Sequence, residues 1–532
     1  MSKNNSKRSI FLPVIVAITL IAGILIGIYL PDRFENPSNV NIRLRPNKIQ
    51  SILDIIEANY VDSVNRDEII ETTIPEILKN LDPHSVYIPA KDLKRANEPL
   101  QGNFEGIGIS FNMLTDTILV ISTIPGGPSE KTGLHPGDKI LYVNDSLVAG
   151  QGISDEKVMS MLKGPRGTVV NVKILRKGHK DLLDFDITRD KIPIYSVDVA
   201  YMINENTGYI KINNFALTTY DEFMQGLNEL IKKGMENLII DLRGNSGGIM
   251  ESAIQIANEF LSEGRLIVYT KGRKQPRSEA RATGKGEFNS GDLVILIDEW
   301  SASASEILAG AVQDNDRGTI IGRRSFGKGL VQEPVVFPDG SGMRLTIARY
   351  YTPTGRSIQK PYDNGFDEYF ADLNIRYGRG EFGESDSIQF TDSLKYTTPG
   401  GKTVFGGGGI MPDIFVPVDT SGISTYFLQV RPLIYQFSLK FTETHRENLS
   451  RYTESDELEK YLDKQNLMDQ FTDFALKQGI KSDPEGLKIS GKIIHTQIKA
   501  YIARNILNNK GFYPIWENID TTLLYAVDYL EK

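Results

Sequence analysis

The stretch that decides the fold is LVILIDEWSASASEILAGAVQ, residues 293–313. Its first five residues, Leu293–Ile297, are all large and apolar, as is typical of a strand buried on both faces of a sheet. A turn of small residues follows, and Ala304–Gln313 then has the apolar pattern of a helix. A buried strand that leads through a short turn into a helix is the repeating unit of an α/β layer architecture.

Strands and helices alternate around this stretch, from Tyr209 to about Ile321, which predicts an α/β fold class. Further strands are expected through Arg344–Tyr351, whereas the polar, glycine-rich stretch Asp363–Gly401 predicts a long surface excursion. The other elements expected before residue 293 are a strand at Gly208–Asn213, a helix at Tyr220–Lys233, a strand at Leu238–Leu242 and a helix at Ile249–Leu261.

The pattern is different between about Gly102 and Arg189, where short β runs are separated by glycine turns. One helix is expected among them, at Asp155–Leu162. Five strands and a helix in so short a segment predict a small β domain inserted ahead of the α/β region. The expected strands are Ile107–Phe111, Ile118–Ile124, Lys139–Val143, Val169–Leu175 and Leu182–Ile187.

Both ends of the chain are predicted to be helical. Apolar residues at helical spacing in Ile49–Leu81 predict two helices, and Leu433–Phe441 and Leu487–Leu507 are the clearest helical stretches beyond Thr420. The predicted organisation is therefore a linker with a helical region at 31–100, the β domain at 101–190, the α/β core at 191–420 and a helical region at 421–532.

An uncharged apolar run, Ile10–Leu30, is long enough to cross about 30 Å of hydrocarbon as a helix. Lys3, Lys7 and Arg8 precede it, so the positive-inside rule places residues 1–9 in the cytoplasm and exports the rest. A cleaved signal peptide is the alternative, but its apolar region is normally shorter and no small-x-small cleavage site follows Leu30. We expect a single-pass anchor in the inner membrane.

Composition excludes several kinds of site. The chain has no cysteine, which rules out disulfides, thiolate metal sites and a cysteine nucleophile. Its net charge is −8 and no basic stripe stands out, which argues against nucleic acid as the main partner. No group of His, Asp and Glu has the spacing of metal ligands, and we expect neither a metal nor a cofactor.

Ser303 lies in the turn between the buried strand and its helix. Small residues at such a turn leave backbone N–H groups facing a ligand, and the helix adds a positive field. A serine there can attack a carbonyl carbon while adjacent amides bind the oxyanion. Helix capping by serine is the alternative interpretation.

A nucleophilic serine needs a base. No pattern places any of the five histidines near Ser303, whereas Lys328 lies between two glycines in SFGKGLVQ, residues 325–332. Lowering a lysine pKa from about 10.4 to about 7 costs about 4–5 kcal/mol, which burial of the amine can supply. Gln332 is placed to orient the amine, and an ordinary charged turn is the alternative for Lys328. The histidines are His84, His135, His179, His445 and His495.

Five motifs together resemble the C-terminal (tail-specific) processing peptidases, over about residues 45–420. The resemblance implies a ClpP/crotonase-like core, with Ser303 as nucleophile, Lys328 as general base and Gln332 assisting. It also implies an oxyanion hole of backbone N–H groups, which we assign to Ala304 and Gly244. The motifs are LDPHS at 81–85, DLRGNSGG at 241–248, SASASE at 301–306, FGKGLVQ at 326–332 and GGIMPD at 408–413.

The β domain resembles a PDZ domain in FEGIGI, residues 104–109, and in GLHPGDKI, residues 133–140. Closely spaced glycines expose backbone N–H groups to a terminal carboxylate, and the following strand pairs with the peptide. A dinucleotide-binding loop is a poor alternative because no βαβ unit surrounds it. The expected peptide-binding residues are Gly106, Ile107, Gly108 and Ile109.

The combined interpretation is a membrane-anchored serine endopeptidase that binds protein or peptide substrates by their C-termini, with an adaptor or homo-oligomer left open. One alternative is a catalytically inactive PDZ scaffold or adaptor at the membrane. A second is an α/β-hydrolase, because GNSGG at 244–248 fits the Gly-x-Ser-x-Gly elbow with Ser246 as nucleophile. That enzyme would need His445 or His495 as its base.

Overall fold

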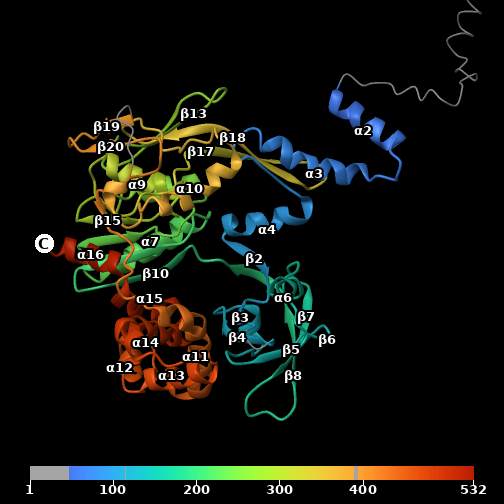
Figure 1. Ribbon diagram of the computed structural model, residues 1–532, viewed down its shortest axis with the longest axis vertical. Helices are drawn as coiled ribbons and strands as arrows, with labels where there is room; N and C mark the ends of the chain where they lie inside the picture. Colours follow the sequence, from blue (N-terminus) through green and yellow to red (C-terminus); the bar gives the residue numbers. More distant parts are fainter. Residues whose placement is uncertain (1–46, 114–115, 389–393) are drawn as a thin grey trace, which may run out of the picture. The chain divides into compact units, whose positions relative to one another are not determined.

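The computed structural model describes residues 47–113, 116–388 and 394–532 (Figure 1). The described residues divide into two compact units, the first ending at Glu76 and the second running from Ile77 to Lys532. The predicted membrane span at 10–30 lies outside the described residues. Within them, no helix combines the length and the apolar character that crossing a bilayer requires.

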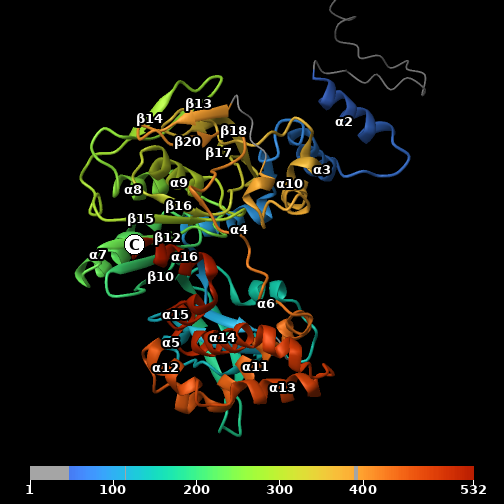
Figure 2. The same cartoon turned by 60° about the vertical axis from the view of Figure 1, so that its left-hand side comes forward.

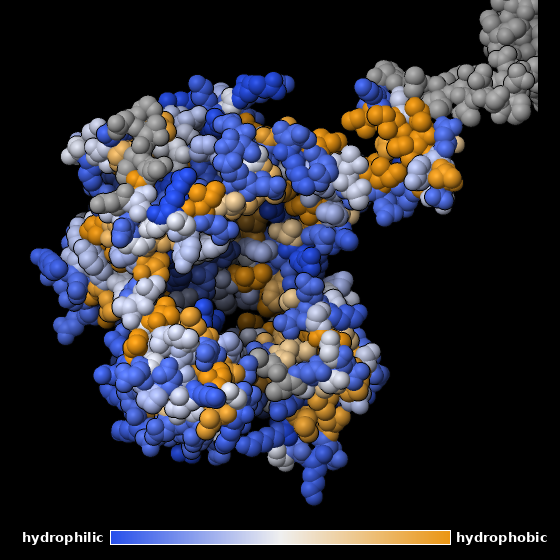
Figure 3. Space-filling view, in the orientation of Figure 1, coloured by the Kyte–Doolittle hydropathy of each residue, from blue (hydrophilic) through white to orange (hydrophobic). Residues whose placement is uncertain are grey.

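The first unit contains α2 (Lys48–Asn59) and most of α3 (Arg66–Leu78), as the helical spacing predicted. The Asn47 side chain begins α2 by accepting the Ile49 N–H, and Arg66 joins the helices by pairing with carboxylates of α2 at 2.9 Å. Several large apolar side chains of α2 are exposed (Figure 3), among them Ile49 and Ile52.

A six-stranded sheet forms the centre of the second unit and confirms the predicted α/β class. Its first two strands pair antiparallel and all others pair parallel. Helices α7 (Thr219–Lys232), α8 (Met250–Asn258) and α9 (Ala304–Asp314) connect successive strands. The strand order is β10 (Val197–Met202), β11 (Thr207–Ile212), β12 (Asn237–Asp241), β15 (Leu293–Ile297), β16 (Thr319–Gly322) and β21 (Ile414–Phe415).

Alternate residues of these strands enter two different cores, as the period of a strand requires. Ile240 and Ile295 pack against α7, α8 and α9, whereas Ile239 and Leu296 pack against α16 (Thr521–Leu530). The last helix of the chain therefore covers the second face of the sheet (Figure 2).

A second sheet carries the segment that follows Lys328. Strand β17 (Leu330–Val336) pairs antiparallel with β18 (Gly342–Tyr351) and so positions Gln332. The rest of the sheet consists of β1 (Val86–Ile88), β13 (Leu266–Lys271) and β14 (Ser278–Arg281), and a separate ribbon consists of β19 (Lys395–Thr397) and β20 (Thr403–Phe405).

The predicted surface excursion at 363–401 is partly wrong. It contains α10 (Phe366–Gly378) and a short 3-10 helix, η1 (Ser385–Ser387). Tyr369 and Arg376 of α10 are buried, so this helix is part of the packed structure. Its polar sequence had indicated a loop.

The β domain, which we call the inserted module (residues 101–190), follows α4 (Ala90–Gln101). Its two ends pair with each other, β2 (Asn103–Gly106) antiparallel to β9 (Asp190–Pro193). Strand β3 (Ile109–Asn112) is one edge of its sheet. The remaining elements, close to those predicted, are β4 (Ile118–Thr123), α5 (Pro128–Lys131), β5 (Lys139–Val143), β6 (Ser146–Leu147), α6 (Asp155–Leu162), β7 (Val169–Leu175) and β8 (Leu183–Thr188).

The C-terminal region is helical and has an aromatic core of its own, which includes Phe437 and Phe471. Side-chain caps begin three of its helices, because Ser424, Asp483 and Asp520 each accept a backbone N–H three residues on. Its elements before α16 are α11 (Thr425–Leu449), α12 (Ser455–Leu462), α13 (Leu467–Lys477), α14 (Pro484–Leu507), α15 (Asn509–Trp516) and η3 (Glu517–Ile519).

Candidate active site

Ser303 occupies the sharp turn between β15 and α9, immediately before the first residue of the helix. Its backbone has φ +55° and ψ −113°, a conformation that non-glycine residues rarely adopt. Such strained residues persist only where the surroundings enforce them, and they are enriched at functional sites. Ala304 follows as the first residue of α9, whose N-terminus carries the positive end of the helix dipole.

The carboxylate of Glu306 joins the serine turn to the lysine loop. It accepts the N–H groups of Ser303 at 2.8 Å, Gly327 at 2.8 Å and Lys328 at 2.9 Å, and the Ser325 hydroxyl at 2.5 Å. Burial raises the pKa of Glu306 to about 7, although these donors favour the charged form. Sequence reasoning missed this residue, but Ser-x-x-Glu at the start of a helix is a capping-box signal that could have found it.

A second connection runs through Tyr350 of β18. Its hydroxyl is 3.1 Å from the Ser303 carbonyl oxygen and 2.6 Å from the Lys328 carbonyl oxygen. The backbones of the two predicted catalytic residues are therefore held by two buried side chains, Tyr350 and Glu306.

The half-buried Lys328 side chain points its amine toward the predicted helper, donating to Gln332 Oε1 at 3.2 Å. In this arrangement, no hydrogen bond between the described atoms joins the amine to the Ser303 hydroxyl. Burial lowers the pKa of Lys328, and the Arg344 guanidinium lowers it further, against the opposing charges of Glu306 and Asp82. Both effects make the amine lose its proton more easily than an ordinary lysine does, which is the direction that a base requires.

The LDPHS segment lies beside the lysine, a placement that no sequence pattern indicated. Gln332 donates its amide N–H to the His84 carbonyl, and His84 Nε2 is 2.7 Å from the Tyr369 hydroxyl of α10. Burial lowers the pKa of His84 to about 3, so the ring is neutral at physiological pH. Asp82 holds the segment by accepting the His84 and Ser85 N–H groups at 2.9 Å each.

The glycine-rich turn at 243–248 packs directly on the serine turn. The Ala302 N–H donates to the Asn245 carbonyl at 3.0 Å, and Gly247 comes so close that an added Cβ would lie 2.7 Å from Ser303 Cβ. The N–H of the expected oxyanion donor Gly244 donates to Asp298 Oδ1 at 2.9 Å in this arrangement. Ala304 has no such partner recorded within the described residues.

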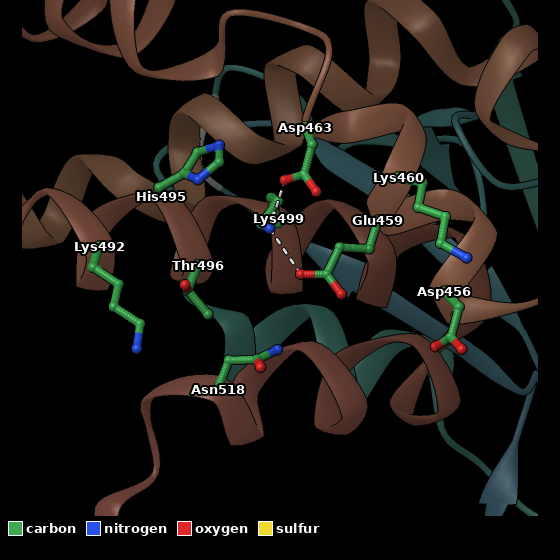
Figure 4. A pocket seen from close by; sticks show the side chains of 9 residues that line it. All are labelled: Asp456, Glu459, Lys460, Asp463, Lys492, His495, Thr496, Lys499 and Asn518. Atoms are coloured by element: carbon green, nitrogen blue, oxygen red, sulfur yellow. Dashed lines mark hydrogen bonds and ion pairs between the residues drawn. The ribbon is translucent and has the colours of Figure 1, made fainter.

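The two histidines that the alternative nucleophile Ser246 would require, His445 and His495, lie in the C-terminal helical region. His445 stacks on Phe441, and His495 lines a polar cavity of about 520 Å³ in the C-terminal helical region (Figure 4). That cavity is lined by both acids and lysines, and its Lys499 is paired with Glu459 and Asp463 at 2.7 Å each. Both histidines thus belong to a separate part of the fold.

In the predicted peptide-binding loop of the inserted module, two backbone carbonyls accept hydrogen bonds from within the module. The Ile107 carbonyl accepts the Ser129 N–H and hydroxyl, and the Gly108 carbonyl accepts the Ile124 N–H. For the N–H groups of Ile107 and Gly108, no acceptor is recorded in the described parts of the chain. Gly106 ends β2 and Ile109 begins the edge strand β3, so the four predicted residues form one continuous loop.

The described residues contain no group of three His, Cys, Asp or Glu side chains that could hold a metal ion. The reactive groups near Ser303 that the structure describes include its own hydroxyl, the Lys328 amine and backbone amides.

Comparisons with known families place three matches along the chain. Residues 206–366 match Peptidase family S41, residues 106–187 match the PDZ domain, and residues 426–508 match a family of unknown function.

Among curated proteins, a carboxy-terminal-processing protease of Bartonella bacilliformis is 35% identical over 58% of this chain and 71% of that protein. The carboxy-terminal processing proteases CtpB and CtpA of Bacillus subtilis are 35% and 33% identical, each over 59% of this chain. The chain spans just under two thirds of their lengths, 65% and 66%. Among solved structures, a photosystem II D1 C-terminal processing protease is 26% identical over 70% of this chain and 87% of that chain, with a TM-score of 0.36.

Proposed function

Because this chain belongs to the carboxy-terminal processing proteases of peptidase family S41, we propose that it is a serine endopeptidase with Ser303 as nucleophile and Lys328 as general base. The observation that carries this assignment is the shared carboxylate of Glu306, which accepts backbone N–H groups of both residues. A serine and a lysine far apart in sequence are thereby fixed on one buried anchor.

The first step of the reaction transfers a proton from the serine to the lysine. Neutral Lys328 leaves Gln332 Oε1 and accepts the Ser303 proton while Oγ attacks the peptide carbonyl carbon. Burial and the neighbouring Arg344 support this role, because both lower the pKa of the amine. The Gln332 amide, held on the His84 carbonyl, limits where the amine can move.

The tetrahedral intermediate needs donors for its oxyanion. The Ala304 N–H at the start of α9 supplies one, and the helix dipole adds a favourable field. The Gly244 N–H can serve as the second donor only after it leaves Asp298. The protonated Lys328 then returns its proton to the leaving amine, and water activated by the same amine hydrolyses the acyl-enzyme.

The inserted module supplies substrate selection by binding a free C-terminus. The N–H groups of Ile107 and Gly108 suit a terminal carboxylate, and the open edge of β3 suits an added peptide strand. Gly108 has φ +73°, which the loop requires and which L side chains rarely adopt.

Paired alanine variants test the catalytic assignment. Ser303→Ala is expected to reduce cleavage of an unstructured protein substrate by at least about a thousandfold, whereas Ser246→Ala keeps most activity. The reverse result would support the hydrolase alternative. Labelling of the wild type, but not of Ser303→Ala, by a fluorophosphonate probe excludes an inactive scaffold.

Terminus recognition is tested with one substrate in two forms, with a free and with an amidated C-terminus. Amidation removes the carboxylate, so cleavage at limiting substrate concentration is expected to fall about tenfold or more. Equal cleavage of the two forms would refute this part of the proposal.

We also propose, from sequence alone, that residues 10–30 anchor the chain in the inner membrane and that the catalytic part is exported. Protease added outside spheroplasts is expected to digest the exported part while a cytoplasmic marker stays intact. Release of the full chain from membranes by alkaline carbonate would contradict a spanning anchor.

A further inference from the structure

Helix α11 of the C-terminal region lies against the outer face of the inserted module's sheet (Figure 1). Three contacts spaced along the helix define its course. Arg446 lies beside Gly137, just before β5, where an added Cβ would be 3.5 Å from Arg446 Nε. Leu439 packs on Leu119 of β4, and Tyr435 is hydrogen-bonded to Asn112 of β3.

These contacts follow the strand order of the sheet. Leu119 and Asn112 are direct cross-strand partners, and Leu439 and Tyr435 are one helical turn apart. Four residues of helix rise about 6 Å, close to the spacing of about 4.8 Å between neighbouring strands. Helix α11 therefore crosses the sheet from β5 toward β3, with one helical turn between its contacts on β4 and β3.

Continued in the same direction, the next turn of α11 is expected to extend past the edge of the sheet. Strand β3 is the edge, and in the described structure no strand pairs on its outer side. Arg431 lies four residues before Tyr435, and Leu428 lies three residues earlier on the same face. Both are exposed, Leu428 at 59%, and within the described residues no ion pair is recorded for Arg431. This face thus lies where an added strand would pair.

The register of a bound peptide follows from the loop that would hold its carboxylate. A peptide that pairs antiparallel with β3, its carboxylate on the Ile107 and Gly108 N–H groups, has its last residue opposite Ile109. The residue three positions before the end then lies opposite Asn112. Ile109 and Phe111 pack into the module's core, so Asn112 and its partner face outward, toward α11.

We propose that Leu428, Arg431 and Tyr435 of α11 form a specificity subsite for the substrate side chain three residues before the C-terminus. The cationic Arg431 makes an acidic side chain the preferred occupant, with Leu428 covering its apolar stem. The subsite rests on the proposed recognition of free C-termini by the inserted module. It gives the C-terminal helical region a direct part in choosing substrates.

The test measures binding of ten-residue fluorescein-labelled peptides to the full chain carrying Ser303→Ala, by fluorescence anisotropy. The peptides differ only three residues before the C-terminus, where they carry Asp, Ala or Lys. The Asp peptide is expected to bind about two- to fivefold more tightly than the Lys peptide, the range for an exposed ion pair. The preference is expected to disappear in Arg431→Ala and to reverse in Arg431→Glu.

Lys440→Ala is the matched control, because Lys440 lies on the opposite side of the same helix, over the Phe474 ring. It is expected to keep the preference for Asp. An Asp preference that persists in Arg431→Ala, or its absence in the parent protein, would overturn the subsite. If amidated and free peptides bind equally, recognition of the terminus itself fails, which distinguishes that failure from failure of the subsite.

Discussion

The amine of Lys328 owes its lowered pKa to two separable causes, burial and the Arg344 guanidinium. A general base must be neutral, so kcat/KM is expected to rise with pH as Lys328 loses its proton. Replacing Arg344 with glutamine removes a neighbouring positive charge and makes protonation of the amine easier. We therefore expect Arg344→Gln to move the acid limb of the pH–rate profile to higher pH.

Arg349→Gln provides the control for this prediction, because Arg349 is on the same strand but pairs with the Tyr362 hydroxyl instead. Its profile is expected to keep the midpoint of the parent enzyme. An acid limb that does not move in Arg344→Gln would show that the limb reports another group.

Glu306 makes the stability of the fold depend on pH. Its pKa is raised from 4.5 to about 7, so the folded state binds a proton that the unfolded state has released between these values. The stabilisation from this proton is complete below about pH 4.5 and is lost as pH rises through about 7. Glu306→Gln, which resembles the protonated form, lacks this dependence.

Urea unfolding at several pH values measures the effect. The free energy of unfolding of the parent protein is expected to decline more steeply between pH 5 and pH 8 than that of Glu306→Gln. Glu517, whose pKa burial also raises to about 7, contributes equally to both proteins. If the free energy of unfolding falls equally with pH in the two proteins, Glu306 is not the source of the pH dependence.

At the scale of the element, the glycine-rich turn and the serine turn form one packed unit. A methyl group at Gly247 would meet Ser303 Cβ and the Ala302 carbonyl oxygen at 2.7 Å, whereas one at Gly244 would meet open space. Both glycines have positive φ, 96° and 74°, so alanine strains the backbone by about 1 kcal/mol at each. Only Gly247→Ala is expected to displace the nucleophile.

Comparing the two alanine variants separates this displacement from backbone strain. Gly247→Ala is expected to lower kcat at least about a hundredfold, and Gly244→Ala is expected to keep kcat within about tenfold. Similar losses of kcat in both variants would indicate that backbone strain, and not displacement of Ser303, causes the loss of activity.

Elements with strong local patterns were predictable from the sequence. The bounds of β5, β7, β15 and α6 agree with those expected, because each is an apolar run or helical pattern bounded by turn residues. Helix α8 ends at Asn258, earlier than predicted. Glu259 turns inward there to accept the Tyr220 hydroxyl at 2.9 Å, a tertiary contact that periodicity does not reveal.

The candidate site was predictable to a similar extent. Motifs identified Ser303, Lys328 and Gln332 by residue type and spacing. Tyr350 and the LDPHS segment come from other parts of the chain, and only the folded sheet brings them to the lysine. The engagement of Gly244 by Asp298 likewise depends on the tertiary arrangement of two turns.

At the scale of the whole molecule, Asp520 near the C-terminus contacts Arg243 of the glycine-rich turn. Arg243 pairs with Asp520 through both terminal nitrogens at 2.7 Å and with Asp241 at 2.6 Å. Asp520 also caps α16, which covers one face of the central sheet. The last helix of the chain is thus tied to the glycine-rich turn and to the central sheet by side-chain contacts.

The charge of Asp520 can be removed without removing its cap, because asparagine is an equally good N-cap. Asp520→Asn is expected to destabilise the protein by about 1–3 kcal/mol through the lost charge-assisted hydrogen bonds, measured by urea unfolding. Asp483→Asn changes the cap of α14 in the same way, but no arginine of the described residues pairs with Asp483, and we expect a loss of at most about 0.5 kcal/mol. Equal losses would refute a special role for Arg243.

The pairing of β2 with β9 makes the inserted module exchangeable. Its two chain crossings lie side by side in one antiparallel ladder, about 5 Å apart, so the rest of the chain meets the module as a closed loop. The entropy of closing that loop depends only weakly on how many residues it encloses. A different sensor domain that has adjacent termini and a face to pack on α11 could therefore replace the module while the flanking ladder keeps its register, which offers evolution and protein engineering a route to new substrate control.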